Sequence, residues 1–131
     1  MISIEVETRA VEEFIDITAL VQRSIDAAKM KSGLCLVFVP HTTAGVTINE
    51  NADPSVQADI LLALKQVVPA ALPFQHDEGN STAHVKAGLI GSSASLIVED
   101  GRLRLGTWQA IYFCEFDGPR RRKVWVGLLP G

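Results

Sequence analysis

Short β-type segments separated by turn residues dominate the last third of the chain, and this pattern restricts the fold more than any other feature. Turn residues occur at Asp100-Gly101 and at 117–119, and apolar-rich runs occupy residues 95–100, 102–106, 107–116 and 123–129. Asp, Gly and Pro in such positions favour tight connections between antiparallel strands. The pattern therefore predicts antiparallel sheet, and the final run is expected to close it.

The N-terminal part of the chain changes its apolar period. Residues 2–8 and 13–17 alternate apolar and polar side chains, which predicts the two half-buried strands of a hairpin. From Thr18 onward the apolar spacing becomes helical, with Thr18 as the N-cap and Gly33 just beyond the helix end. The apolar run at 34–40 then predicts a buried strand.

An Asp-Pro pair predicts the start of a second helix after a short extended piece at 46–49. Asp53 can accept backbone N–H groups as the N-cap, and Pro54 suits the first helical position. This helix is expected to end at the next proline, and a short third helix is expected to begin at Asn80 or Ser81. Strands and helices that alternate with short connections predict an α+β unit.

The length of 131 residues, 47% of them hydrophobic, is enough for one domain, residues 1–131, with its own core. We expect an α+β fold with a mixed or antiparallel β-sheet and two to three helices. No apolar run approaches the roughly 20 residues that cross a bilayer, and the N-terminus lacks the pattern of a signal peptide. We therefore expect a cytoplasmic protein with no membrane partner.

Charge and cysteine content exclude further classes of function. The net charge of −3 gives no general attraction to nucleic acid, and the only basic cluster is residues 120–123. We therefore expect no nucleic-acid partner. Cys35 and Cys114 lie inside apolar runs, which predicts small buried core residues and no disulfide or redox role.

All three histidines of the chain, His41, His76 and His84, lie in polar segments at strand or helix ends. Such segments are where polar groups can converge on a ligand without disturbing the core. Three imidazoles with one open position are the ligand pattern of a catalytic zinc, and imidazole also suits other divalent metals. The alternative is three separate surface histidines, each bonded to nearby backbone, and the spacing alone does not decide.

Other polar residues are candidates for the same site. Glu78 and Asp53 could ligate a metal, orient an imidazole or act as general base, although capping alone explains Asp53. Arg120 suits phosphate binding, or it is part of a solvated turn. Trp108 could form a pocket wall or belong to the core, and Asn49 could enter the site or hold its loop.

Several longer motifs resemble those of the YjbQ family, in the expected order and spacing over nearly the whole chain. The motifs are HTTAGVTINENADP at 41–54, HDEGN at 76–80, AHVK at 83–86, GRLRLGTWQ at 101–109 and CEFDGPR at 114–120. The resemblance implies a YjbQ-like α+β fold with a mixed sheet and assembly as a homotrimer. Its polar positions fall on His41, Asn49, Asp53, His76, Glu78, His84, Trp108, Gln109 and Arg120.

The resemblance also implies an activity, because members are described as secondary thiamine-phosphate synthases that join a thiazole phosphate to a pyrimidine diphosphate. In this hypothesis His41, His76 and His84 hold a divalent metal, zinc or, with a diphosphate substrate, magnesium. Asp53, Glu78 and His41 are catalytic. The phosphorylated substrate contacts Asn49, Trp108, Gln109 and Arg120. The alternative is a non-catalytic protein that binds a metal or a phosphorylated metabolite, and a weaker one is an RNA- or protein-binding module using residues 120–123.

Overall fold

The structure is a computed structural model that describes residues 1–131, and it consists of two antiparallel sheets and three helices. This confirms the predicted α+β class. The elements follow one another as β1 (Ile2–Glu7), β2 (Glu13–Asp16), α1 (Thr18–Ala28), β3 (Gly33–Phe38), β4 (Ala44–Glu50), α2 (Ser55–Val67), α3 (Ser81–Ile90), β5 (Ser93–Glu99), β6 (Arg102–Leu103), β7 (Gln109–Glu115) and β8 (Arg121–Pro130).

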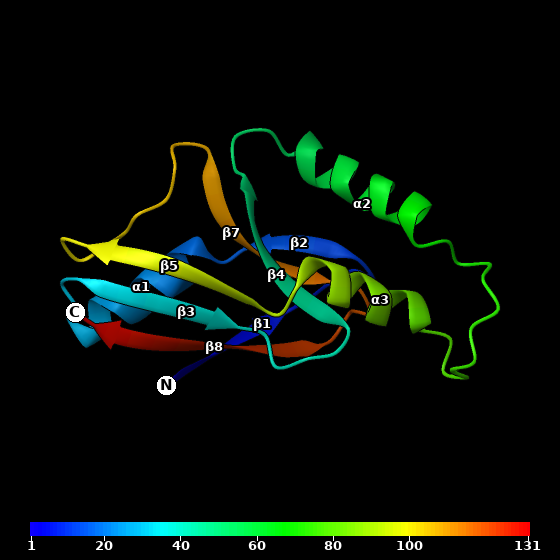
Figure 1. Cartoon of the computed structure of the whole chain (residues 1–131), viewed down its shortest axis with the longest axis horizontal. Coiled ribbons are helices and arrows are strands. Elements are labelled where there is room, and N and C mark those ends of the chain that lie inside the picture. The colour runs from blue at the N-terminus through cyan, green and yellow to red at the C-terminus, as the bar shows by residue number, and fades with distance from the viewer.

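The strands are divided between a five-stranded sheet with the order β1-β8-β3-β5-β6 and a three-stranded sheet with the order β2-β7-β4 (Figure 1). Every strand pair is antiparallel. Figure 1 also shows α2 and the loop at 69–79 extending from one end of the molecule, away from both termini. The chain therefore passes repeatedly between the two sheets, and only β5 and β6 are consecutive strands of the same sheet.

The predicted N-terminal hairpin is wrong, because β1 and β2 belong to different sheets. β1 pairs with β8, with Ile2 opposite Val126, whereas β2 pairs with β7, with Glu13 opposite Glu115. Alternation of apolar and polar residues reports which face of a strand is buried but not which strand lies beside it. The segment between the two strands crosses from one sheet to the other.

The last strand does not close the sheet as expected, since β8 lies between β1 and β3. Its ten residues are long enough to pair with both neighbours, and Val126 lies opposite Ile2 on one side and Val37 on the other. The turn at 117–119 likewise joins β7 to a strand of the other sheet. Turn residues predict that the chain reverses direction, but they do not predict which sheet the next strand joins.

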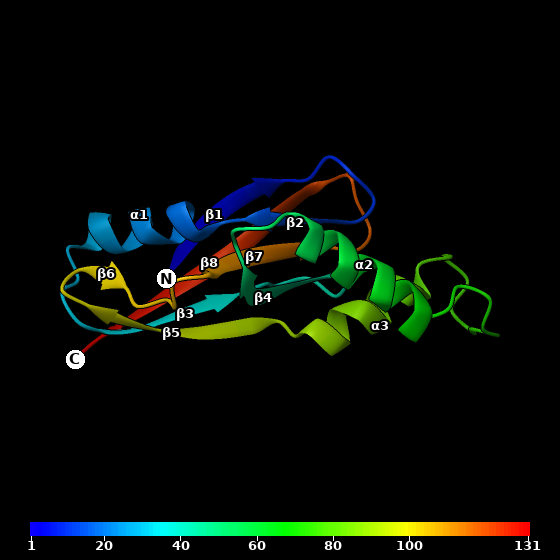
Figure 2. The same cartoon turned by 90° about the horizontal axis from the view of Figure 1, so that it is seen from above.

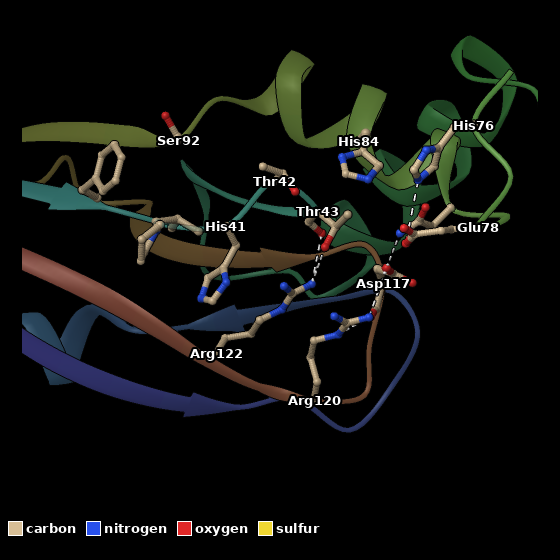
Figure 3. A pocket seen from close by; sticks show the side chains of 14 residues that line it. His41, Thr42, Thr43, His76, Glu78, His84, Ser92, Asp117, Arg120 and Arg122 are labelled. Atoms are coloured by element: carbon tan, nitrogen blue, oxygen red, sulfur yellow. Dashed lines mark hydrogen bonds and ion pairs between the residues drawn. The ribbon is translucent and has the colours of Figure 1, made fainter. Parts of the chain in front are cut away.

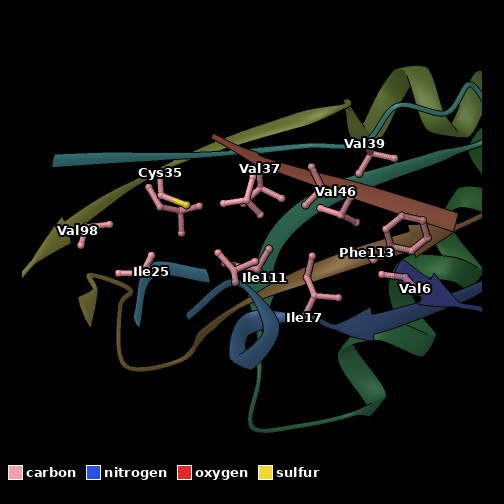
Figure 4. Close-up of a cluster of buried hydrophobic side chains, with 14 of the residues drawn as sticks. Val6, Ile17, Ile25, Cys35, Val37, Val39, Val46, Val98, Ile111 and Phe113 are labelled. Atoms are coloured by element: carbon pink, nitrogen blue, oxygen red, sulfur yellow. The ribbon is translucent and has the colours of Figure 1, made fainter. Parts of the chain in front are cut away.

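The main core lies between the two sheets and α1 (Figure 4). Val37 of β3, Ile111 of β7 and Ile25 of α1 are all fully buried in it. Figure 2 shows α1 alongside the sheets, at the far end of the molecule from α2 and α3. The two cysteines are free and buried, as predicted, and burial raises the pKa of the Cys35 thiol to about 11.

A second apolar cluster fixes α2 and α3 on the outer face of the three-stranded sheet. Ala83 and Ala87 of α3 pack there against Tyr112 of β7, and Leu61 and Leu64 of α2 pack at its margin. Because β7 has helices on one side and the main core on the other, its residues 110–115 are all buried. This packing holds the start of α3 close to the end of β7, and polar residues from both elements lie near one another there.

The helix starts differ in part from those predicted. The second helix begins at Ser55 with Pro54 in the N-cap position, one residue later than expected. Asp53 still caps its start, since its carboxylate accepts hydrogen bonds from the Ser55 N–H and hydroxyl at 2.9 and 2.7 Å. The expected role of Thr18 is wrong. Thr18 is the first residue of α1, and its Oγ1 accepts the Ile111 N–H at 2.9 Å, because β7 passes beside this helix end.

The outer face of the five-stranded sheet has no helix over it and carries large apolar side chains. Leu34, Leu36 and Phe38 of β3 point to this face together with Ile97 of β5 and Leu129 of β8, and all are exposed. Exposed apolar surface of this kind is characteristic of interfaces. No helix of the structure has the length and apolar character needed to cross a membrane.

We expect Ile111→Val to lower the free energy of unfolding by about 1 kcal/mol, because it removes one methylene from a fully buried site. The control change Val67→Ala, on a side chain of α2 that is 66% exposed and lies outside this apolar face, should alter it by less than about 0.5 kcal/mol. Urea unfolding of both variants measures the difference. Equal effects at the two positions would contradict the assignment of Ile111 to the core.

Candidate functional site

A polar pocket with a volume of about 750 Å³ lies where the β3–β4 loop, the 69–79 loop, the start of α3 and the β7–β8 turn meet. The pocket brings together residues from segments far apart in sequence. Fourteen residues line it: Phe38, Val39, Pro40, His41, Thr42, Thr43, His76, Glu78, Asn80, His84, Ser92, Asp117, Arg120 and Arg122. Five of the residues singled out from the sequence are among them, including every histidine of the chain.

The three histidines occupy two sides of the pocket (Figure 3). His76 and His84 lie together, with ring centroids 5.4 Å apart and ring planes almost perpendicular. Glu78 lies beside them, with its Oε2 3.8 Å from the Nε2 of His76. His41 lies across the pocket, next to Arg122.

The ring of His41 is held by the backbone of β8. Its Nε2 accepts a hydrogen bond from the Lys123 N–H at 2.9 Å. In a neutral imidazole with Nε2 as acceptor, the proton resides on Nδ1. Partial burial, and after it the nearby Arg122 guanidinium, lowers the pKa of His41 below its ordinary value of 6.5. His41 is therefore a neutral imidazole at pH 7, and its free nitrogen is a donor.

A buried ion pair that the sequence did not indicate forms the floor of the pocket. Arg122 and Glu115 are 3% and 0% exposed, and the Arg122 Nε lies 2.9 Å from one carboxylate oxygen and 3.1 Å from the other. The Thr8 hydroxyl also donates to Glu115, at 2.8 Å. Burial alone would raise the pKa of Glu115, but the hydrogen bonds from Arg122 and Thr8 outweigh it and hold the pKa below its usual value.

A second polar chain links the β7–β8 turn to the start of α3. Arg120 donates through Nη2 to the Asp117 carboxylate at 3.1 Å, and Asn80 donates through Nδ2 to the same carboxylate oxygen at 2.9 Å. The Oδ1 of Asn80 is buried and has no hydrogen-bond partner. Arg120 itself is half exposed at the rim.

The sequence could not single out Arg122, Glu115 or Asp117 as site residues. Arg122 stands within a run of arginines that is typical of a solvated turn, and Glu115 follows the apolar residues of β7. The only sequence signal for this ion pair would have been the position of each residue on its strand. Glu115 ends β7 and Arg122 lies near the start of β8, each at a position that faces inward. Their pairing depends on two strands in different sheets, which the sequence does not bring together.

Four predicted residues do not line the pocket, namely Asn49, Asp53, Trp108 and Gln109. They gather at the far end of the three-stranded sheet. Asn49 lies opposite Ala110 near the end of β4, roughly 20 Å of strand away from Thr43 at about 3.3 Å per residue. Trp108 is 64% exposed and Gln109 accepts the Gly106 N–H. Their predicted roles stay predictions. Within one chain, these four residues lie away from the pocket that contains the histidines.

Asp53 has a structural function in this place. Its carboxylate accepts the Ser55 hydroxyl and N–H at the start of α2, and these two hydrogen bonds lower its pKa. The predicted catalytic role of Asp53 stays a prediction. Glu78, in contrast, lines the pocket beside His76.

The predicted three-histidine metal site also stays a prediction. No group of three or more His, Cys, Asp or Glu side chains is placed to hold a metal ion together. His41 is separated from the other two and has committed its Nε2 to Lys123. His76, His84 and Glu78 are the neighbouring donors that best suit a divalent metal in chemical type.

The lowered pKa of His41 predicts a pH dependence of stability. Unfolded chains bind a proton at this position near pH 6.5, whereas the folded chain resists it, so stability is present above pH 6.5 and is lost as pH falls through the folded pKa. We expect His41→Asn to lose less stability than the parent between about pH 7.5 and about pH 5. Urea unfolding at both pH values tests this, and identical losses in the two proteins would contradict it.

The fold and the site define a small α+β protein with two antiparallel sheets and a single pocket that collects all its histidines. The model of the family described as "UPF0047 protein YjbQ-like" matches residues 2–131, and the chain belongs to this family. The resemblance seen in the motifs is thereby confirmed.

Relatives share most of their length with this chain. The UPF0047 protein of Methanocaldococcus jannaschii is 50% identical over 125 residues, which cover 95% of this chain and 91% of that protein. The UPF0047 protein YugU of Bacillus subtilis is 47% identical over 128 residues, 97% of each chain. The crystal structure of a YjbQ/UPF0047 family protein of Clostridium acetobutylicum is similar at a TM-score of 0.96 and 53% identity, covering 98% of this chain and 100% of that chain.

Proposed function

We propose that the protein is a cytoplasmic transferase that acts on phosphorylated small molecules in the histidine pocket, with slow thiamine-phosphate synthase activity as its measurable reaction. One observation carries the proposal. All three histidines of the chain and two arginines line a single polar pocket, although they come from segments far apart in sequence. Imidazole and guanidinium groups are suited to binding phosphates and moving protons.

The chemistry of the proposed reaction decides which residues matter. The thiazole nitrogen forms a bond to the methylene carbon of the pyrimidine, and the bond from that carbon to the diphosphate oxygen breaks. The bonding electrons leave with pyrophosphate. Because the attacking ring nitrogen carries no proton, no base is required for this step. The main demand is stabilisation of negative charge on the leaving group.

The pocket residues meet that demand. Arg120 and Arg122 supply guanidinium groups, and the neutral His41 supplies an N–H donor. The first N–H groups of α3 have no side-chain cap and carry the positive end of the helix dipole. His84 lies in the first turns of that helix, and we assign it, with the neighbouring His76 and Glu78, to holding a metal that offsets charge rather than to acting as an acid or a base.

We propose a divalent metal, zinc or magnesium, as the cofactor. His76, His84 and Glu78 would hold it after a small movement of the 69–79 loop, and it would offset charge on the diphosphate. Elemental analysis of protein purified without an affinity tag tests this independently of activity. We expect bound metal in the parent and none in His84→Ala. Metal-free parent protein that keeps its turnover in excess chelator would overturn this part of the proposal.

The second candidate is a protein that binds a phosphorylated metabolite without turnover. One observation favours it: the guanidinium groups of Arg120 and Arg122 are already paired with Asp117 and Glu115, which reduces the positive charge left to stabilise a departing diphosphate. Such a site would hold a phosphate and leave it unchanged.

A single experiment separates the two candidates. Untagged protein is incubated with the thiazole phosphate and the pyrimidine diphosphate, and thiamine phosphate and pyrophosphate are measured together. Equal, slow appearance of both products supports the transferase. Binding of either substrate by calorimetry without product supports the binding protein. Neither binding nor product would reject both.

We also propose that the protein is a homotrimer, and the uncovered apolar face of Leu34, Leu36, Phe38, Ile97 and Leu129 supports it. Light scattering at micromolar concentration should give about three times the chain mass of 14.2 kDa. Leu36→Glu should reduce that mass, because it inserts a charge into the face. The matched change Ala27→Glu, at an exposed position of α1, should not. A monomeric parent would overturn the proposal.

A further inference from the structure

Arg122 presents one unused end of its guanidinium group to the pocket. Its Nε donates to both oxygens of Glu115, and its Nη2 donates to Glu115 and, at 2.8 Å, to the Thr43 hydroxyl. Its Nη1 has no partner within the chain. Nη1 is not fully buried. The only side-chain nitrogen or oxygen that is both fully buried and without a hydrogen-bond partner is the Oδ1 of Asn80, so the unpartnered Nη1 must retain some contact with solvent. Arg122 is itself a lining residue of the pocket, so we infer that a ligand there can reach Nη1.

The carboxylate that neutralises Arg122 is turned away from this opening. Glu115 Oε2 accepts the backbone N–H groups of Phe116 and Asp117 at 3.1 and 3.2 Å, and Oε1 accepts the Thr8 hydroxyl at 2.8 Å. Its negative charge is therefore shared among donors on the protein side. The pair can stay buried while the two N–H bonds of Nη1 remain available to a ligand acceptor.

A second donor lies beside the first. His41 accepts the backbone N–H of Lys123, the residue that follows Arg122, so its ring is fixed next to the guanidinium (Figure 3). With Nε2 occupied as an acceptor, the neutral ring carries its hydrogen on Nδ1. Arg122 is only 3% exposed and His41 is half-buried. Both donors are therefore held in place by their surroundings, unlike a mobile side chain on the surface.

We propose that the Nη1 of Arg122 and the Nδ1–H of His41 form an oxyanion subsite at the floor of the pocket, which binds a phosphoryl group of the substrate. This rests on the proposed function for the identity of the substrate but not for the presence of the subsite. It changes the role expected of His41. The imidazole acts as a neutral donor to an oxygen rather than as a metal ligand or base.

The geometry also explains why both groups are needed together. Guanidinium and imidazole N–H groups that are held in place lose little conformational freedom when a phosphoryl oxygen arrives. A phosphoryl group has three outer oxygens, so it can accept from Nη1 and Nδ1–H with different oxygens. Rim residues such as Arg120 add charge, but Arg120 is half exposed and already paired with Asp117.

The test measures binding of inorganic phosphate and of pyrophosphate by calorimetry, without any turnover. His41→Phe removes the donor and should weaken binding of both by about 10-fold or more. His41→Asn places an amide N–H where Nδ1 stood and should bind within about 3-fold of the parent. Arg122→Lys keeps a charge for Glu115 but lacks Nη1, and should also weaken binding by about 10-fold or more.

Controls make each outcome informative. Arg104→Gln, at an exposed arginine outside the pocket, should bind as the parent does. If Arg122→Lys fails to fold, His41→Phe and His41→Asn carry the test alone. Nitrogen-15 NMR of the His41 ring should show the hydrogen on Nδ1. Parental phosphate binding by His41→Phe, or a hydrogen on Nε2, would overturn the subsite. Phosphate binding without thiamine-phosphate formation would leave the subsite intact and reject the activity.

Discussion

Replacing Glu115 by alanine is expected to lower the free energy of unfolding by about 3–5 kcal/mol, because it leaves the Arg122 guanidinium buried without its counter-charge. The backbone N–H groups of Phe116 and Asp117 and the Thr8 hydroxyl lose their acceptor as well. The midpoint of thermal unfolding should fall by roughly 10 °C or more. Urea and thermal unfolding measure both quantities.

Two further variants separate charge burial from packing. Glu99→Ala, at an exposed carboxylate of β5 without an ion pair, should change stability by less than about 0.5 kcal/mol. The double change of Glu115→Leu with Arg122→Met should recover much of the loss, because apolar side chains of similar size need no counter-charge. A single Glu115→Ala variant as stable as the parent would show that the pair is not closed in solution.

Replacing His84 by alanine is expected to lower the rate of thiamine-phosphate formation by at least about 10²-fold, the lower range for loss of one group that stabilises charge on the leaving group, because it removes a ligand of the proposed metal. The fold should remain intact, since α3 packs through Ala83 and Ala87 rather than through the imidazole. Val85→Ala, at the exposed neighbouring position outside the pocket, is the matched control and should keep parental turnover. Product formation by His84→Ala at the parental rate would remove this pocket as the site of the reaction.

Asp53→Ala is expected to behave differently from His84→Ala, although the sequence suggested a catalytic role for Asp53, because Asp53 does not line the pocket. Its carboxylate caps α2 at the end of the three-stranded sheet opposite the pocket, so the expected effect is a small loss of stability. Turnover per folded molecule should be unchanged if each chain forms its own site. A loss of turnover with intact folding would instead show that the far end of one chain completes the pocket of another.

The sequence by itself determined the class of fold and the faces of the strands whose residues alternate. Alternation at residues 2–8 placed Ile4 and Val6 inward on β1 and left Ser3 and Glu5 outward, because successive side chains of a strand point to opposite faces. The all-apolar run of β3 predicted a buried strand, and this is wrong for its outer face, where Leu34 and Leu36 are exposed. The Asp-Pro pair fixed the start of α2, since capping depends on atoms within a few residues. The polar setting of the histidines also marked the segments that form the pocket. These features are local, so a short stretch of sequence contains their cause.

Only the tertiary structure decided which strands are neighbours and which polar residues meet. The sequence pattern predicts a hairpin of β1 and β2, yet β1 pairs with β8 and β2 with β7, and these two C-terminal strands belong to different sheets. That same division brings Glu115 at the end of β7 against Arg122 at the start of β8, and leaves Asp53 at the other end of the sheet. Long-range pairing is set by how apolar faces cover one another, and alternation within a strand contains no information about its partner.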